Sequence, residues 1–529
     1  MIEIDGNSLT IEQVTAVARA AAPVAPLSES VRAEMTRSME WLRGVIERDE
    51  RTIYGVNTGF GPLANRRIRP EETSRLSRNL VLNCLAGVGD PLPEEIVRAM
   101  MLVRANSLAK GLSGVRPELA ETLIEMLNRG VTPEVPCKGS LGASGDLAPQ
   151  AHIAVVLLAE PAEGAEPPDG GEGFSGHALY GGERLIGEEA MSRAGLARIR
   201  PEAKDGLALT NGTDFMVGTA ALAVADAESL LSHAEIAAAL SLEALCALSA
   251  AFHPALQEAS GQPGQMAVAA RLRSLFAGSD LIDTEPDRVQ DAYSLRCVPQ
   301  VLGPPRDLLG FLGERVTTQL NAASDNPLVF MDLPGQEPGT LSGGNFHGQG
   351  PALWLDVLGI AMADVGGIAE RRIFRLLTAE LSGGLPAMLI ENDGLDSGLM
   401  VVQYTAAALV SDNKTLAHPD SVDSVPSSGN QEDHVSMGAN AARHAREIVE
   451  NVRTIVAIEL MTAAQAIDLR RDGPSRLGRA TRVAYGKIRE RVSKLERDRQ
   501  LSPDIGTLVE LIYSRELLEA VEAVEAATP

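Results

Sequence analysis

The sequence predicts a mainly α-helical protein built around a long helical bundle. Aromatic residues make up only 3% of the 529 residues, and the β-branched and aromatic runs that favour strands are scarce. Alanine, leucine, glutamate and arginine, which favour helices, are abundant. Stretches rich in alanine and leucine, several of them long enough to be rods of one bundle, cover about 214–252, 304–323, 352–381 and 439–469.

The length of the chain predicts more than one domain. A chain of 529 residues is too long for one ordinary core unless long helices carry an extended one. We therefore expect an N-terminal helical domain over 1–210, and a central bundle with C-terminal helices over 211–529. Near the start, the segment 10–13 (Thr-Ile-Glu-Gln) has the pattern of a capped helix N-terminus. Two further helices are expected at about 75–86 and 94–108.

Loops rich in glycine and polar residues interrupt the helices. Prolines and glycines are so frequent in 131–149 that we expect a tight loop there and no helix. Residues 160–182, rich in glycine, proline and acid, predict an exposed excursion that tolerates deletion. Other loops of this kind, which a bundle has no reason to contain unless they build a site, are 54–61, 291–300, 342–350 and 421–438.

Charge and cysteine content narrow the possible partners. The formal net charge of −24 should repel polyanions, so we expect no nucleic-acid partner. The N-terminus has no basic and apolar signal-peptide pattern, and acidic residues interrupt the apolar stretch 215–251, which predicts a buried bundle helix and no membrane span. The four cysteines form no paired motif, so we expect a cytoplasmic protein without structural zinc.

The segment 139–149 (Gly-Ser-Leu-Gly-Ala-Ser-Gly-Asp-Leu-Ala-Pro) has an unusual chemical possibility. Because Gly145 has no Cβ, its amide nitrogen can approach the carbonyl carbon of Ala143, and loss of water then closes a five-membered ring. Loss of a second water from Ser144 leaves an exocyclic methylene, an electrophile that no ordinary side chain supplies. The alternative interpretation is a glycine-rich turn with a helix N-cap at Asp146, and the tripeptide alone does not decide.

The surrounding sequence does decide, because it resembles the histidine and phenylalanine ammonia-lyase family. The hallmark of that family is the run Gly-Ser-x-Gly-Ala-Ser-Gly-Asp-Leu-x-Pro-Leu, from which this chain differs only at Gln150. Further matching segments, in order, are 54–61 (YGVNTGFG), 210–213 (TNGT), 290–296 (QDAYSLR), 325–328 (DNPL), 343–347 (GGNFH) and 430–434 (NQEDH).

The resemblance implies an ammonia-lyase/fumarase-like helical fold, a homotetramer and an aromatic amino acid substrate. It implies a 4-methylidene-imidazol-5-one (MIO) prosthetic group, formed from Ala143, Ser144 and Gly145, to which the substrate amine adds. No metal is expected. The reaction would remove ammonia and a β-proton to give a trans-arylacrylate, by covalent and general base catalysis.

Roles for single residues follow from the matching motifs. Tyr54 corresponds to the base on a mobile loop, although the alternative is a tyrosine that packs at a turn and has no catalytic role. Arg296 corresponds to the group that clamps the substrate carboxylate, although a surface ion pair is the commoner fate of an arginine. The polar groups that orient the ring and the substrate are Asn211, Tyr293, Gln290 and Asn345. Apolar groups beside the substrate are Leu207 and Phe346. We interpret His347 and His434 as structural.

Two regions bear on which amino acid is the substrate. Glu432 is the histidine-type residue, because a carboxylate can accept a hydrogen bond from an imidazole or indole N–H but not from a phenyl ring. Asn83 and Cys84, however, stand where histidine lyases typically have Ser-His, and Met388 stands where they often have phenylalanine. A roomier pocket that takes a larger N–H ring such as that of tryptophan, with or without histidine, is our hypothesis.

Three alternatives remain open from the sequence. The first is a strict histidine ammonia-lyase that produces urocanate, and the second is a 2,3-aminomutase that uses the same prosthetic group. The third, from a different class, is a catalytically silent helical scaffold, against which the intact Ala143-Ser144-Gly145, Tyr54 and Arg296 all argue.

Overall fold

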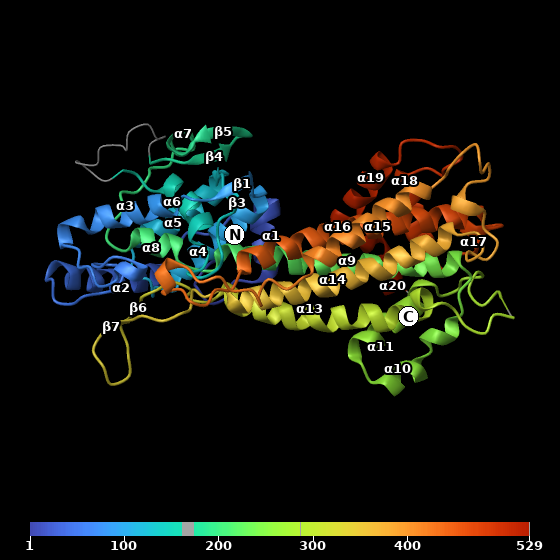
Figure 1. Ribbon diagram of the computed structural model, residues 1–529, viewed down its shortest axis with the longest axis horizontal. Coiled ribbons are helices and arrows are strands. Elements are labelled where there is room, and N and C mark those ends of the chain that lie inside the picture. The colour runs from blue at the N-terminus through green and yellow to red at the C-terminus, as the bar shows by residue number, and fades with distance from the viewer. Residues whose placement is uncertain (161–173, 286, 528–529) are drawn as a thin grey trace. The chain divides into compact units, whose positions relative to one another are not determined.

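The computed structural model describes residues 1–160, 174–285 and 287–527, which form two compact units. The first unit comprises Met1–Leu222, Gly313–Asp356 and Pro419–Arg443, and the second comprises Ala223–Leu312, Val357–His418 and His444–Pro529. Four long helices contribute residues to both units: α9 (Asp214–Ala244), α13 (Val298–Leu320), α14 (Gln349–Leu377) and α16 (Gly438–Leu469) (Figure 1). The predicted domain boundary near residue 210 stays a prediction.

The helical fold class predicted from the sequence is confirmed. The other α-helices of the first unit are α1 (Ile11–Ala20), α2 (Glu29–Glu47), α3 (Thr73–Cys84), α4 (Glu94–Ala109), α5 (Pro117–Arg129), α6 (Leu147–Leu157), α7 (Gly187–Arg193) and α8 (Asp205–Thr210). Those of the second unit are α10 (Pro254–Ser260), α11 (Pro263–Leu275), α12 (Tyr293–Arg296), α15 (Met400–Leu416), α17 (Gly473–Arg476), α18 (Arg479–Arg491), α19 (Ser502–Tyr513) and α20 (Glu516–Ala526). Short 3-10 turns are η1 (Gly61–Leu63), η2 (Pro70–Glu72), η3 (Ser249–Phe252), η4 (Ala387–Leu389) and η5 (Ser428–Asn430).

Three small antiparallel sheets accompany the helices of the first unit. They pair β1 (Val88–Pro91) with β3 (Pro136–Lys138), β2 (Thr132–Pro133) with β4 (His177–Tyr180) and β4 with β5 (Glu183–Ile186), and β6 (Leu328–Phe330) with β7 (Gly339–Leu341). In the register, Ala178 lies opposite Leu185 and Leu328 lies opposite Leu341. Strand β4 lies within the predicted 160–182 excursion, of which residues 161–173 are outside the described part of the chain.

Local sequence signals explain several helix ends. The Thr10 hydroxyl accepts a hydrogen bond from Gln13 N, and the Gln13 side chain accepts one from Thr10 N, which confirms the predicted capped helix start. Helix α5 begins with Pro117 and ends at Gly130 in the left-handed conformation, because proline suits the first helical position and glycine the position after the last.

Several predicted helix boundaries are wrong. Helix α9 ends at Ala244, whereas the prediction extends it to about residue 252. The segment 131–149, predicted to be a tight loop, contains the strands β2 and β3. It also contains the start of α6 at Leu147, and Pro149 lies in the first turn of that helix, where the missing N–H costs no hydrogen bond. Helix α13 begins at Val298, earlier than the predicted start near residue 304, and carries Pro304 and Pro305 inside it.

The core of the first unit surrounds α4. From Ile96 to Ala109 every residue of this helix is buried, and helices α1, α2 and α5 pack against it. Because no face of α4 reaches solvent, its two arginines, Arg98 and Arg104, must find all their partners inside the protein.

In the second unit, a buried carboxylate joins three long helices. Glu459 on α16 accepts hydrogen bonds from Arg372 Nε and Nη2 on α14 at 2.5 and 2.8 Å, and from the Ser241 hydroxyl on α9 at 2.7 Å. The side chains of Arg372 and Glu459 are completely buried. By length and composition α9 and α14 could each cross a membrane, but 72% and 56% of their apolar windows are buried, and core helices of compact proteins pass the same test.

We expect Arg372→Met to lower the free energy of unfolding by about 3–5 kcal/mol, because it leaves the Glu459 carboxylate buried without its cation. Denaturant-induced unfolding followed by circular dichroism measures the change. The control is Arg471→Met, since the Arg471 side chain is 95% exposed and should shift stability by less than about 0.5 kcal/mol. Equal losses in the two variants would contradict this account of the buried pair.

Candidate active site

The loop that carries Ala143, Ser144 and Gly145 is held by a direct main-chain contact with Gly212. Gly145 has a φ of +72°, and a Cβ built on it would overlap the carbonyl oxygen of Gly212. The next residue, Asp146, donates its backbone N–H to that oxygen at 2.7 Å. Gly145 and Gly212 pair as a short parallel bridge. Only glycine fits at position 145, because any side chain would force the two segments apart.

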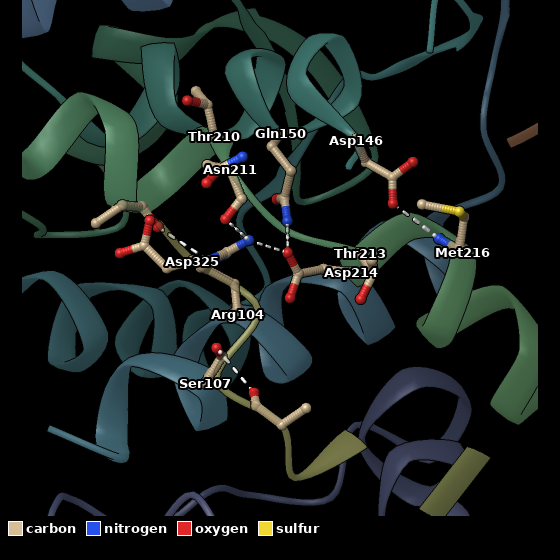
Figure 2. A network of polar contacts seen from close by, with 12 residues as sticks. Arg104, Ser107, Asp146, Gln150, Thr210, Asn211, Thr213, Asp214, Met216 and Asp325 are labelled. Carbon is tan, nitrogen blue, oxygen red and sulfur yellow. Dashed lines mark hydrogen bonds and ion pairs between the residues drawn. The ribbon is translucent and has the colours of Figure 1, made fainter. Parts of the chain in front are cut away.

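Two helices begin at this contact and stabilise each other. Asp146, directly before α6, accepts a hydrogen bond at 3.1 Å from Met216 N in the first turn of α9 (Figure 2). In return, Gln150 in the first turn of α6 donates to the carboxylate of Asp214, the first residue of α9. The N-termini of helices carry partial positive charge, so both helix starts favour negative charge near this loop. Complete burial nevertheless raises the pKa of Asp146 to about 7.

Ser144 contacts two predicted site residues. Asn211 donates its side-chain N–H to Ser144 O at 2.8 Å, and the Ser144 hydroxyl donates to Glu432 Oε1 at 2.7 Å. The other oxygen of Glu432 accepts hydrogen bonds from the hydroxyls of Ser427 at 2.5 Å and Ser428 at 2.9 Å. Partial burial acts to raise the pKa of Glu432, but the hydroxyl donors outweigh it and hold that pKa below its ordinary value.

Tyr54 lies in a loop that packs against the same region. Its phenolic oxygen accepts a hydrogen bond from Gly61 N at 3.1 Å, and η1, which starts at Gly61, contacts η5, which starts at Ser428. The residue after Tyr54, Gly55, lies against the side chain of Leu207, which is on α8 one turn before Asn211. These contacts link the Tyr54 loop, Leu207, Asn211, Ser144 and Glu432 in a closed ring within the first unit.

The 342–350 loop contacts the 139–149 loop by its main chain. Gly348 N donates to Gly142 O at 3.1 Å. Asn345 is exposed and donates its side-chain N–H to Ala323 O at 3.1 Å, whereas Phe346 is half-buried.

The two histidines that we interpreted as structural lie next to each other. Their rings stack with centroids 5.8 Å apart. Because His347 Nδ1 accepts from Gln349 N, its Nε2 carries the proton and donates to His434 O at 3.1 Å. No group of three His, Cys, Asp or Glu suited to a metal ion occurs among the described residues.

Four predicted site residues belong to the second unit: Gln290, Tyr293, Arg296 and Met388. Gln290 is exposed, and Tyr293 is 71% exposed. The guanidinium of Arg296 lies over the Tyr293 ring, 4.7 Å from its centroid, and Arg296 Nε is buried without a hydrogen-bond partner among the described residues. Asp291 anchors the segment by accepting from Leu248 N at 2.7 Å.

The remaining predicted pocket residues differ in their surroundings. At the end of α3, Asn83 is exposed and Cys84 is buried, and burial raises the pKa of the Cys84 thiol to about 11. Met388 is half-buried in η4, in the left-handed conformation, with a φ of +55°.

Sequence reasoning missed the partners of these residues. Ser427 and Ser428 were not singled out, although their place directly before the matched segment 430–434 was a usable signal. Arg104 and Asp214 carried no signal, because an arginine in a helix and an acidic residue at a helix start are common.

Comparison with known proteins identifies the relatives of the chain. A family model described as aromatic amino acid lyase matches residues 9–490. Histidine ammonia-lyases from Symbiobacterium thermophilum and Alkaliphilus oremlandii are 50% and 47% identical to it, each over 98% of both chains. Two solved structures are similar. Trypanosoma cruzi histidine ammonia-lyase has a TM-score of 0.87 at 37% identity, covering 99% of this chain and 95% of that one. Streptomyces globisporus tyrosine aminomutase has a TM-score of 0.89 at 36% identity, covering 99% and 98%.

The raised pKa of Asp146 predicts how stability depends on pH. The folded protein keeps this proton up to about pH 7, whereas the unfolded chain loses it near the ordinary value of 3.8, so the contribution of Asp146 to stability falls as pH rises between the two. Asn does not titrate. The free energy of unfolding of Asp146→Asn, relative to that of wild type, should therefore rise between pH 5 and pH 8 by up to about 1.4 kcal/mol per pH unit. Thermal midpoints of both proteins across this range measure the change. A pH-independent difference between the two proteins would show that burial does not protonate Asp146.

Proposed function

Because the chain belongs to the aromatic amino acid lyase family and is a carbon–nitrogen lyase, we propose that it eliminates ammonia from L-histidine to give urocanate. The observation that carries this proposal is the position of Glu432, whose carboxylate lies 2.7 Å from the Ser144 hydroxyl. Formation of the prosthetic group would remove the Ser144 hydroxyl, and an imidazole N–H could then donate to Oε1 in its place, whereas a phenyl ring has no N–H to donate. The similarity to histidine ammonia-lyases supports histidine better than the tryptophan of our sequence-based hypothesis.

The residues present fit the MIO prosthetic group. Ring closure joins Gly145 N to the carbonyl carbon of Ala143, and the carbonyl oxygen leaves as water with the amide protons of Gly145 and Ser144. A second water takes the Ser144 hydroxyl and its Cα proton. The positive φ of Gly145 and its contact with Gly212, which a Cβ would prevent, suit such a bent loop. When formed, the group supplies an electrophilic methylene carbon.

The other residues act on the substrate in this proposal. Tyr54 removes the β-proton, and its oxygen already accepts an N–H donor from Gly61. Arg296 binds the substrate carboxylate, since its Nε has no partner. Asn211 donates to Ser144 O, which becomes the ring carbonyl oxygen, and so favours negative charge there. Orientation of the substrate and the shape of its pocket fall to Gln290, Tyr293 and Asn345, and to Leu207, Phe346, Asn83, Cys84 and Met388.

We also propose that the protein works as a homotetramer. In the second unit, α14 and α15 carry apolar side chains that stay exposed in a single chain: Ile360 and Phe374 on α14 at 48% and 40%, and Val401 and Tyr404 on α15 at 58% and 56%. Further copies of the chain would bury such surfaces. A cytoplasmic location stays a prediction.

The substrate test measures ultraviolet absorbance of the arylacrylate and released ammonia for histidine, tryptophan, tyrosine and phenylalanine. We expect histidine to give both products in equal amounts, and Ser144→Ala to give neither. Efficient turnover of tryptophan alone would restore the wider-pocket hypothesis. A β-amino acid product would indicate an aminomutase, and no product from any amino acid would indicate a silent scaffold.

We expect Glu432→Gln to lower kcat/KM for histidine by about 10- to 150-fold. A hydrogen bond to a charged group contributes about 1.5–3 kcal/mol, which corresponds to this range. Any residual activity on phenylalanine should fall less, because phenylalanine has no ring N–H. The matched control is Asp433→Asn, an exposed neighbour for which we expect little change. Equal losses on both substrates would remove Glu432 from ring recognition.

A further inference from the structure

Arg104 holds, from inside the first unit, the segment that carries Asn211. Its guanidinium is 1% exposed and donates to Ala208 O and to Asn211 O, each at 3.0 Å. It also forms an ion pair with Asp214 (Figure 2). One rigid, planar side chain therefore fixes both the end of α8 and the start of α9.

The same guanidinium lies directly behind Gly212. A Cβ built on Gly212 would overlap Arg104 Nη2 and would come within 2.6 Å of Ser324 Oγ. On its other side, Gly212 contacts Gly145 of the prosthetic-group loop. The main chain at Gly212 is thus held between Arg104 and Gly145 with no room for a side chain.

Gln150 completes the arrangement. Its side-chain N–H donates to the Asp214 oxygen that also accepts from Arg104, and all three side chains are buried. The second Asp214 oxygen has no hydrogen-bond partner, so the carboxylate depends on these two side-chain donors. Position 150 is where the chain departs from the Leu of the family run, and a leucine could not donate.

We propose that Arg104, Asp214 and Gln150 form a positioning network that presses the Asn211-Gly212 main chain against Gly145 and so promotes ring closure. This inference rests on the proposed prosthetic group. Closing the ring requires Gly145 N to approach the Ala143 carbonyl carbon. A loop that is already held in the bent conformation loses less conformational entropy when the ring closes. Without the network, the loop would relax away from Gly212 and keep an ordinary peptide chain.

The first test is the intact mass of purified Arg104→Lys. Lysine keeps one positive charge, but its donors share a single nitrogen and cannot take the separate positions of Arg104 Nη1 and Nη2. We expect the fraction of chains that have lost two waters to fall at least about tenfold, with an unchanged circular dichroism spectrum. The matched control is Arg98→Lys. Arg98 is also a buried arginine of α4 that donates to main-chain carbonyls, but those belong to Val17 and Leu127, so this variant should mature fully.

A second pair of variants tests Gln150 without removing the buried cation. Gln150→Leu removes the donor and should slow the loss of water. Gln150→Glu keeps the shape, but an ionised carboxyl cannot donate to Asp214, whereas a protonated one can. The charged groups near this position are Arg104, Asp214 and Asp146. Refolding of Gln150→Glu at pH 5 should yield more matured chain than refolding at pH 8. Loss of packing alone would not create this pH profile.

The outcomes separate the inference from the proposed function. If wild-type protein shows no loss of two waters, the prosthetic group itself is refuted. If wild type matures and folded Arg104→Lys matures equally, the network is refuted while the function stands. Arg98→Lys maturing as poorly as Arg104→Lys would also overturn the inference, as would a pH-independent Gln150→Glu. Should Arg104→Lys fail to fold, the two Gln150 variants decide alone.

Discussion

The hydrogen bond from Asp146 N to Gly212 O joins the starts of α6 and α9, and the part of the site in the first unit is arranged around it. The two main chains can touch because residue 145 is glycine, since a Cβ there would overlap Gly212 O. At 212 a Cβ would overlap Arg104 instead. Each helix then supplies a side chain to the other: Asp146 binds the first turn of α9, and Gln150 binds Asp214. Removing one of these contacts would loosen both helix starts at once.

This constraint leaves Ser144 with a different partner on each of its polar groups. The carbonyl oxygen meets an N–H of Asn211, and the hydroxyl meets the carboxylate of Glu432. The side-chain donors that surround Glu432 are hydroxyls, and they hold its pKa low without neutralising its charge as a cation would. Under the proposed function, an ionised carboxylate with spare lone pairs beside Ser144 suits a substrate that brings its own N–H.

The sequence predicted the features that arise from local pattern. Helices α3 and α4, the four long helices and the capping box at Thr10 have periodic or capping signals that need no tertiary knowledge. The wrong starts, at α6 and α13, both involve prolines, whose effect depends on which helical turn they occupy. Strand β4 was missed because its pairing partners fix it more than its own composition does.

Site residues divide in the same way. The motifs identified Tyr54, Asn211 and Glu432, and the structure brings them together, but no motif indicated Arg104, since its partner Asp214 is 110 positions away. Contacts at such separation leave no trace in a single sequence. Buried polar atoms do leave one in the structure: an arginine that is 1% exposed must be paired at a specific place, and that place is the main chain behind Gly145. The cost of burying that charge is reason to look for a function in the residues that it holds.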